Sequence, residues 1–236
     1  MSVHAFLVEI GRVRAMLANE ADAAAVTHLE DVRRAVVNAV RPKAVITLYD
    51  DQALVPEWHA ARLTRALSNV YNRALRDTYG AAVDIFPLRS RLTAEDARLF
   101  VARAGEDIAG ITETTRQAVR LALRDALLAR EAPSQVAARL EKLAVFDVNR
   151  AATIAETEVA RATNAAAMLV FKKDPRVVGV VVHDAERCRP DGGPCAGQNG
   201  RTLTMPEADA TPLLYHPRCS AIRSPLLVGD EGGARP

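Results

Sequence analysis

The chain has few of the residues on which several protein classes depend. Aromatic residues make up 4% of its 236 residues, and three cysteines are too few for a disulfide-rich secreted scaffold. No apolar run approaches the roughly 18 residues of a membrane span, and residues 1–17 lack the apolar segment of a signal peptide. The formal net charge of +2 is too small to indicate nucleic-acid binding by bulk charge. We therefore expect a protein made in a reducing cytoplasm, without a membrane segment.

The composition instead favours helices. Alanine accounts for much of the 49% of residues that are apolar, and alanine has the highest helix propensity. Apolar side chains recur at helical spacing along most of the chain up to residue 173. This periodicity predicts helices at residues 4–19, 21–40, 56–79, 108–130 and 151–173, with further helices beginning near Thr93 and Ser134. Gly80 is expected to end the third of these helices.

The C-terminal part of the chain has a different pattern. Residues 177–182 (VVGVVV) form a continuous β-branched run, which is typical of a buried strand, and residues 201–204 (RTLT) indicate a return strand. We expect an α+β fold that is predominantly helical. A helical N-terminal region, residues 1–105, precedes a small C-terminal α/β module, residues 106–225. The last residues, 226–236, indicate a disordered tail.

All three cysteines lie within one stretch of this C-terminal module. Cys188, Cys195 and Cys219 are accompanied there by His216, three residues before the last cysteine. Three thiolates and one imidazole form a complete tetrahedral set of the kind that closes a structural Zn²⁺ site. In a reducing compartment, clustered cysteines are more often metal ligands than disulfides. The alternatives are a reduced cluster without metal and a disulfide formed after the protein leaves the cell.

The helix predicted at residues 151–173 carries a polar set in an otherwise apolar sequence. Thr157, Arg161 and Asn164 share one face at helical spacing, and Glu158 lies three residues before Arg161, within reach of an ion pair. Buried polar groups must be paired, so these residues predict a structural network that fixes neighbouring loops. The alternative is a catalytic carboxylate, with Glu158 acting as a base.

A basic stripe runs along the helix predicted at residues 108–130. Its arginines repeat every four residues, and a stripe of this kind can track phosphates. The candidate DNA contacts are Arg116, Arg120 and Arg124 of this stripe, together with Arg187 beside the first cysteine. The alternative is a solvated face whose arginines pair with local acidic residues such as Glu113 and Asp125.

The polar helix, the strand and the cysteine cluster together resemble a known family. The segments ETEVARATN, HDAERC, CAGQNGRTL and YHPRC follow one another as they do in the phage Mu protein F-like head morphogenesis family of minor capsid proteins. The resemblance covers roughly residues 110–225. The matching positions are Thr157, Glu158, Arg161, Ala162, Asn164, Asp184, Arg187, Cys188, Cys195, Gly200, His216, Pro217 and Cys219. The chain departs from the family in the six residues between its first two cysteines, where two are usual, and in Ala221, where a further cysteine is frequent.

The resemblance implies a structural virion protein without enzymatic activity. Such a protein is present in few copies, is associated with the portal vertex of the phage head, and acts in head assembly and in DNA packaging or ejection. The implied partners are the phage portal protein, the scaffold or major capsid protein, and packaged DNA. It implies no membrane partner and no small-molecule substrate. It also adds Asp184 to the polar network of the helix.

Two other functional classes fit parts of the sequence. A zinc-dependent enzyme acting on nucleic acid, such as a deaminase, needs an open coordination position and a glutamate beside a ligand. The four expected ligands close the coordination sphere, and His183 is followed by Asp184 rather than by the deaminase pattern. A DNA-binding zinc module is supported by the arginines around the cluster. These are Arg187, Arg189, Arg201, Arg218 and Arg223.

Overall fold

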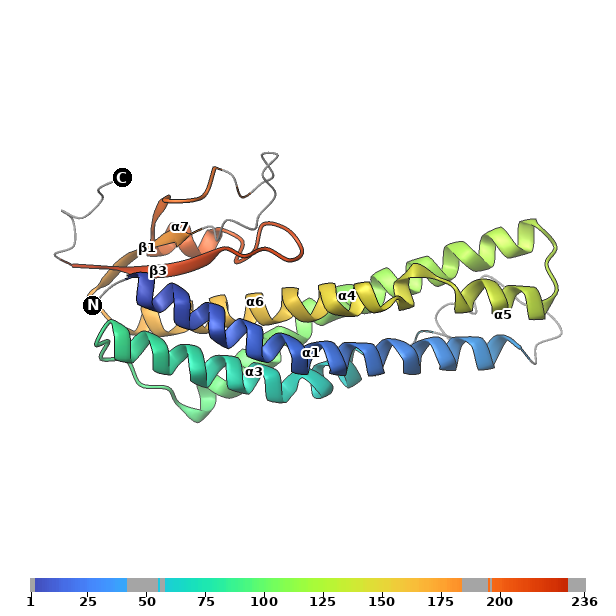
Figure 1. Cartoon of the computed structure of the whole chain (residues 1–236), viewed down its shortest axis with the longest axis horizontal. Helices are drawn as coiled ribbons and strands as arrows, with labels where there is room; N and C mark the ends of the chain where they lie inside the picture. Colours follow the sequence, from blue (N-terminus) through green and yellow to red (C-terminus); the bar gives the residue numbers. More distant parts are fainter. Residues whose placement is uncertain (1–2, 42–54, 56–57, 184–194, 196, 229–236) are drawn as a thin grey trace. The chain divides into compact units, whose positions relative to one another are not determined.

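The computed structural model describes residues 3–41, 55, 58–183, 195 and 197–228, with the side chains of residues 104–107 left out. Within this part the fold is α+β and predominantly helical, as the sequence predicts (Figure 1). The elements are α1 (Val3–Val40), α3 (Trp58–Ile85), α4 (Ala94–Leu128), α5 (Pro133–Glu141), the short 3₁₀ helix η1 (Ala144–Phe146), α6 (Val148–Lys173), β1 (Val177–His183), β2 (Thr202–Thr204), α7 (Met205–Ala210) and β3 (Ile222–Leu227). None of the described helices is long and apolar enough to cross a membrane.

The helices are longer than the sequence pattern predicts. The two helices expected at residues 4–19 and 21–40 form the single helix α1, and α3 continues through Gly80 to Ile85. A glycine inside a helix costs only about 1 kcal/mol, and Ala81 and Ala82, which follow Gly80, are buried in the core. Packing therefore outweighs the local stop signal.

The start of α4 is confirmed at Thr93. The Thr93 hydroxyl accepts a hydrogen bond from the Asp96 backbone N–H at 3.2 Å, and the Asp96 carboxylate accepts one from the Thr93 N–H at 2.7 Å. This reciprocal pair is a capping box in which aspartate takes the position of the usual glutamate. Residues 44–49 (AVITLY), whose composition favours a strand, lie outside the described residues.

The chain forms two compact units, each made of segments that are far apart in sequence. Unit 1 comprises Met1–Asn19, Val70–Phe100 and Glu156–Pro236, and unit 2 comprises Glu20–Asn69 and Val101–Ala155. These units cut across the sequence domains expected at residues 1–105 and 106–225, because α1, α3, α4 and α6 contribute residues to both units. Strand β3 extends two residues into the expected tail, whose residues from 229 onward lie outside the description.

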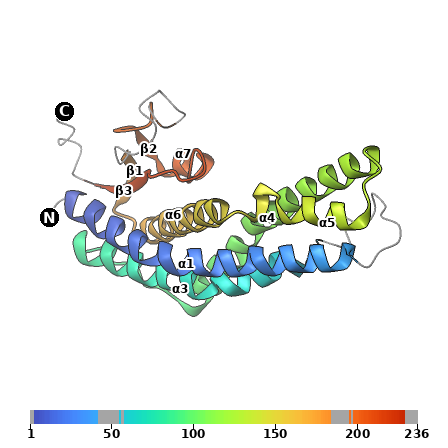
Figure 2. The ribbon, with the colours of Figure 1, turned by 45° about the vertical axis from the view of Figure 1, so that its right-hand side comes forward.

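Unit 1 contains the sheet, which has the order β2-β1-β3 with both pairs antiparallel. Its apolar face packs on helices, and Figures 1 and 2 show the sheet beside the start of α1 and the end of α6. The Phe6 ring of α1 lies at the centre of this core, with its centroid 5.1 Å from that of Phe86 and 6.2 Å from that of Phe171. Val180 and Leu203 of the sheet are buried in the same cluster. The strand predicted at residues 177–182 is therefore confirmed as the central strand.

Unit 2 is built from helices alone in the part that the structure describes. Its largest core joins α1, α4, α5 and η1 through branched aliphatic side chains and one aromatic ring. These residues include Val32, Val36, Val40, Val119, Leu123, Val136, Leu140 and Phe146. His28 and His59 pack edge to face in this unit, with ring centroids 5.8 Å apart, and burial lowers the pKa of His28 to about 4.

Gly179 provides a test of the β1–β2 pairing. A Cβ atom at this position would lie 2.4 Å from the backbone oxygen of Leu203. We expect Gly179→Ala to lower the free energy of unfolding by about 2 kcal/mol, since backbone cannot yield as a flexible side chain can. Gly80→Ala is the matched control, because a Cβ there meets nothing within 4 Å. It should stabilise the helix by about 0.5–1 kcal/mol. Urea unfolding followed by circular dichroism measures both, and equal midpoints for Gly179→Ala and the parent would contradict the pairing.

Candidate metal centre

Three of the four expected metal ligands meet in unit 1. One ligand atom each from Cys195, His216 and Cys219 lies within 4.8 Å of the others, and the two Sγ atoms are 3.5 Å apart. Both cysteines are buried, and His216 is half-buried. Cys188, the fourth expected ligand, lies outside the described residues. The group formed by the other three can hold a metal ion.

A tight turn at residues 216–219 presents two of these ligands. The Cys219 N–H donates to the His216 carbonyl oxygen at 3.2 Å, which closes a four-residue turn. Pro217 occupies the second position, where its fixed φ is favourable, and Arg218 the third, with a φ of 60°. This left-handed conformation normally favours glycine. An arginine there indicates that contacts from the surrounding protein hold the turn.

Helix α6 supplies these contacts. The Thr157 hydroxyl accepts a hydrogen bond from the Arg218 N–H at 3.1 Å, and the Glu156 carboxylate pairs with the Arg218 guanidinium at 3.1 Å. Further along the helix, the buried Asn164 donates its amide N–H groups to the carbonyls of Leu213 and Ala221 at 3.1 and 2.9 Å. Thr157 and Asn164 thus fasten the segment that carries His216 and Cys219.

Glu158 and Arg161 belong to a second part of that network. They form an ion pair, and the Tyr71 hydroxyl of α3 donates to Glu158 Oε2 at 3.2 Å. Glu158 is only 2% exposed. These contacts are those of a carboxylate that joins α6 to α3 within unit 1. Asp184, the remaining member expected from the resemblance, lies outside the described residues.

Sequence reasoning missed Arg14 of α1 as a part of the site. Its guanidinium donates to the carbonyls of Ser220 and Ala221 at 3.0 and 3.1 Å and to the Thr163 hydroxyl at 2.8 Å. These partners lie about 150 to 200 residues away in the sequence, so no local pattern connects them. The only signal in the sequence is that Arg14 directly follows Val13 of the apolar stripe of α1.

Arg223, a candidate nucleic-acid contact in the sequence, is buried instead. It is 2% exposed, and its guanidinium donates to the carbonyls of Ala208, Thr211 and Pro212 at 2.7–3.1 Å. Its neighbour Ser224 forms a 2.7 Å hydrogen bond with the imidazole of His183, whose pKa is lowered by burial. Arg223 therefore fixes the loop between α7 and β3 and offers no charge to a surface ligand.

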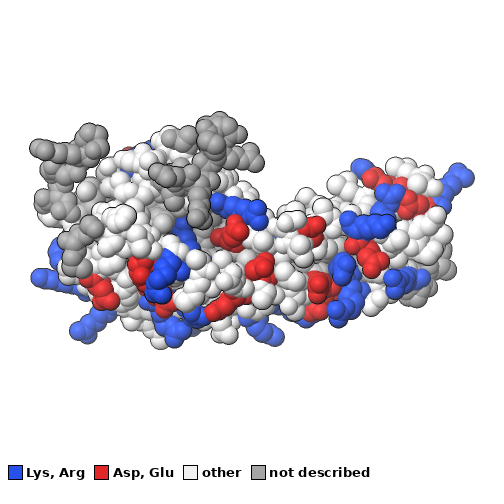
Figure 3. Space-filling view, viewed as in Figure 1, with Lys and Arg blue, Asp and Glu red and all other residues white. Residues whose placement is uncertain are grey.

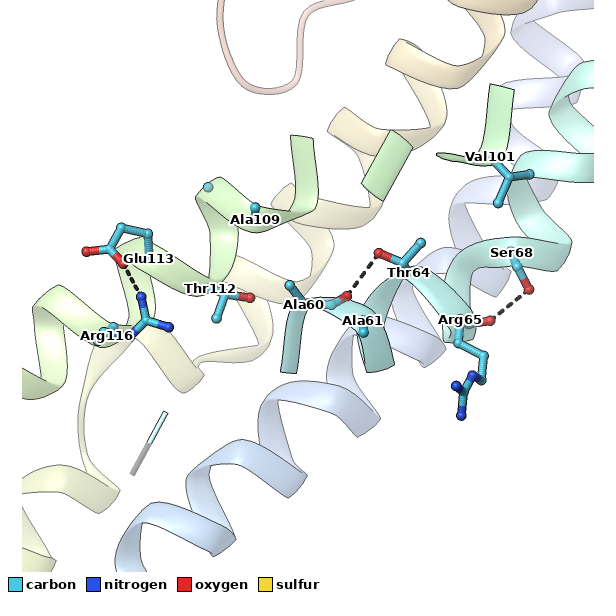
Figure 4. A pocket seen from close by; sticks show the side chains of 11 residues that line it. Ala60, Ala61, Thr64, Arg65, Ser68, Val101, Ala109, Thr112, Glu113 and Arg116 are labelled. Carbon is cyan, nitrogen blue, oxygen red and sulfur yellow. Dashed lines mark hydrogen bonds and ion pairs between the residues drawn. The ribbon is translucent and has the colours of Figure 1, made fainter. Parts of the chain in front are cut away.

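The arginine stripe lies on the part of α4 that belongs to unit 2, whereas the cysteine cluster belongs to unit 1. Arg116 lines a groove of about 840 Å³ between α3 and α4, where it pairs with Glu113 and donates to the Val55 carbonyl at 3.1 Å (Figure 4). Arg124 pairs with Asp125 at 2.9 Å, and Arg120 is exposed. On the face seen in Figure 3, basic and acidic side chains are interspersed. These pairs favour the interpretation as a solvated face, while DNA contact stays a prediction. Arg187 lies outside the described residues.

Asn164 allows the contribution of the network to be measured. Asn164→Ala should lower the free energy of unfolding of unit 1 by about 1–3 kcal/mol, because the Leu213 carbonyl loses the amide donor and the Ala221 carbonyl keeps only the bond from Arg14. Asn149→Ala, on the exposed first turn of the same helix, is the matched control and should change it by less than about 0.5 kcal/mol. Thermal and urea unfolding provide the measurement. Equal destabilisation by the two variants would show that Asn164 does not hold the Cys-His segment.

Comparison with known proteins adds no relative to this description. The chain matches no protein-family model, and no curated protein or solved structure matches it.

Proposed function

We propose that this protein is a structural minor head protein of a tailed phage, and that Zn²⁺ crosslinks the Cys195 loop of its C-terminal segment to the 216–219 turn. The observation that carries the proposal is the meeting of Cys195, His216 and Cys219 on a segment held by the polar face of α6. The polar residues and the ligands are the same ones on which the resemblance to the Mu F-like head morphogenesis family depends. The metal centre and the resemblance to this family therefore depend on the same residues.

The donor set suits Zn²⁺. Two thiolates and an imidazole are typical ligands of this ion, and tetrahedral Zn–S bonds of about 2.3 Å place two sulfur atoms roughly 3.8 Å apart. The observed separation of 3.5 Å between the Sγ atoms of Cys195 and Cys219 is close to that value. Cys188 would complete the set as the fourth ligand. When bound, the ion supplies a crosslink between the Cys195 loop and the 216–219 turn.

A structural role agrees with how the donors are held. Both described cysteines are buried, and the turn that carries His216 and Cys219 is tied to α6. In a catalytic zinc site, one coordination position stays open to water and substrate. A fixed C-terminal unit suits a protein that presents a constant surface to the portal protein, and to scaffold, major capsid protein or packaged DNA, at the portal vertex inside the virion.

The metal is the first point to test. The protein purified without chelator should contain about one zinc per chain. At a free zinc concentration about 1,000-fold above the Kd, the bound metal should raise the free energy of unfolding by about 4 kcal/mol relative to the metal-free protein. Removal of the metal by a chelator should abolish this difference. Cys219→Ser and His216→Ala should abolish this metal-dependent stabilisation, whereas His4→Ala, at an exposed position of α1, should retain it. Metal analysis and thermal unfolding with and without chelator are the measurements. A folded parent protein without zinc, insensitive to chelator, would refute the metal site.

The assembly role needs a separate test. Co-expressed with the portal protein of the phage that the proposal implies, the tagged chain should co-purify with the portal oligomer through size-exclusion chromatography. His4→Ala should co-purify as the parent does, and Cys219→Ser should show at least a tenfold loss, since the fastened segment contributes to the presented surface. A zinc-loaded, folded protein that ignores the portal, scaffold and major capsid proteins would leave the metal site intact and refute the assembly role.

A further inference from the structure

We infer that Thr157 of α6 is a positioning residue for the metal, because its hydroxyl presets the 216–219 turn in its ligand-presenting conformation, with Glu156 as a weaker second contact. This inference rests on the proposed metal site and deepens it. It predicts that metal affinity is controlled from a helix that contributes no ligand. Three features of Arg218 support it: the backbone conformation, the hydrogen bond to the N–H, and the ion pair of the side chain.

The backbone conformation makes the turn improbable without support. A residue with a Cβ atom disfavours the left-handed region by roughly tenfold relative to the right-handed one, and Arg218 has a φ of 60°. In the observed turn, which the Cys219 N–H bond to the His216 carbonyl closes, the ligand atoms of His216 and Cys219 lie within 4.8 Å of each other. A relaxed Arg218 would therefore separate the imidazole from the thiol.

Two side chains of α6 support this conformation. Thr157 Oγ1 accepts from the Arg218 N–H at 3.1 Å, and Glu156 Oε2 lies 3.1 Å from Arg218 Nε. The hydroxyl fixes the direction of the peptide between Pro217 and Arg218. The ion pair is the weaker contact, since both side chains are about half exposed and exposed pairs contribute little.

A preset turn affects the metal more than it affects the fold. Ligands that are already in place need no reorganisation when the ion binds, so the free energy of binding is not spent on ordering them. Groups that orient metal ligands typically change metal affinity by about 10- to 100-fold when removed. Loss of the Thr157 hydroxyl should therefore weaken affinity while the same ligands still bind the ion at saturation.

The test uses Thr157→Val in the full chain, with Thr157→Ser and Thr153→Val as controls. Valine keeps the shape of the side chain and removes the hydrogen-bond acceptor, and serine restores the acceptor. Thr153 lies one turn earlier on α6, where its hydroxyl donates to the Asn149 carbonyl at 2.8 Å.

Co²⁺ titration monitored by absorbance measures both the affinity and the coordination of the bound ion. We expect Thr157→Val to bind about 10-fold more weakly with an unchanged spectrum at saturation, and Thr157→Ser and Thr153→Val to stay within about threefold of the parent. Glu156→Gln should lower affinity by about threefold or less.

Arg218→Gly separates positioning from general stability. Glycine adopts the left-handed region freely, so affinity should stay within about threefold of the parent, and Thr157→Val should weaken binding less in the Arg218→Gly background than in the parent. If Thr157→Val lowers the melting temperature of the metal-free protein while Co²⁺ affinity is unchanged, Thr157 is structural only and the inference is wrong. If the parent itself binds no Co²⁺ or Zn²⁺, the proposed metal site fails instead.

Discussion

The hydrogen bonds from side chains to the backbone of residues 213–221 are the constraint on which the described part of unit 1 depends. This segment is neither helix nor strand, so its carbonyl groups lack the partners that regular structure provides, and buried carbonyls without partners are costly. Asn164 and Arg14 supply the donors for Leu213, Ser220 and Ala221. The segment can therefore lie close to α1 and α6 without secondary structure of its own.

A metal ion and this polar network would act on different parts of the same segment. The network ties the segment to the helices, whereas the Cys195 thiol reaches it from the loop before β2. Without an ion, the connection between that loop and the 216–219 turn is a contact between two thiols 3.5 Å apart, which is a weak hydrogen bond at most. A sheet with strands of three, six and seven residues has a small core of its own, so a crosslink at this point adds stability where packing adds least.

Local patterns in the sequence predicted much of the fold. The helical class, the central strand at residues 177–182, the cap at Thr93 and the return strand near residue 202 all follow from periodicity and capping chemistry. The uninterrupted lengths of α1 and α3 do not, since buried packing decides whether a helix continues through Gly80. Strand β3 does not follow from these patterns either, since Ser224 and Pro225 are unfavourable in a strand. Proline is tolerated there because β3 is an edge strand of the sheet.

The metal ligands of the candidate site could be predicted from the sequence, but the residues that hold them in place were harder to recognise. Cys195, His216 and Cys219 stand out because thiols and imidazoles are rare in this chain. Thr157 and Asn164 stand out because they are polar on an apolar helix, but their partners are backbone groups, which have no sequence signature. Arg14 and Arg223 could not be recognised, since an arginine that donates to distant carbonyls looks like any surface arginine in the sequence.

The polar residues of α6 form two groups that contact different parts of unit 1. Glu158 and Arg161 join α6 to Tyr71 of α3, whereas Thr157 and Asn164 face the segment that carries the ligands. A catalytic carboxylate needs access to substrate, but Glu158 is 2% exposed and already engaged by a tyrosine and an arginine. Helix α6 thus connects α3 to the irregular segment of residues 213–221, and its polar side chains form the hydrogen bonds and the ion pair that hold these elements together. The burial and the two partners of Glu158 are therefore those of a carboxylate that holds two helices together.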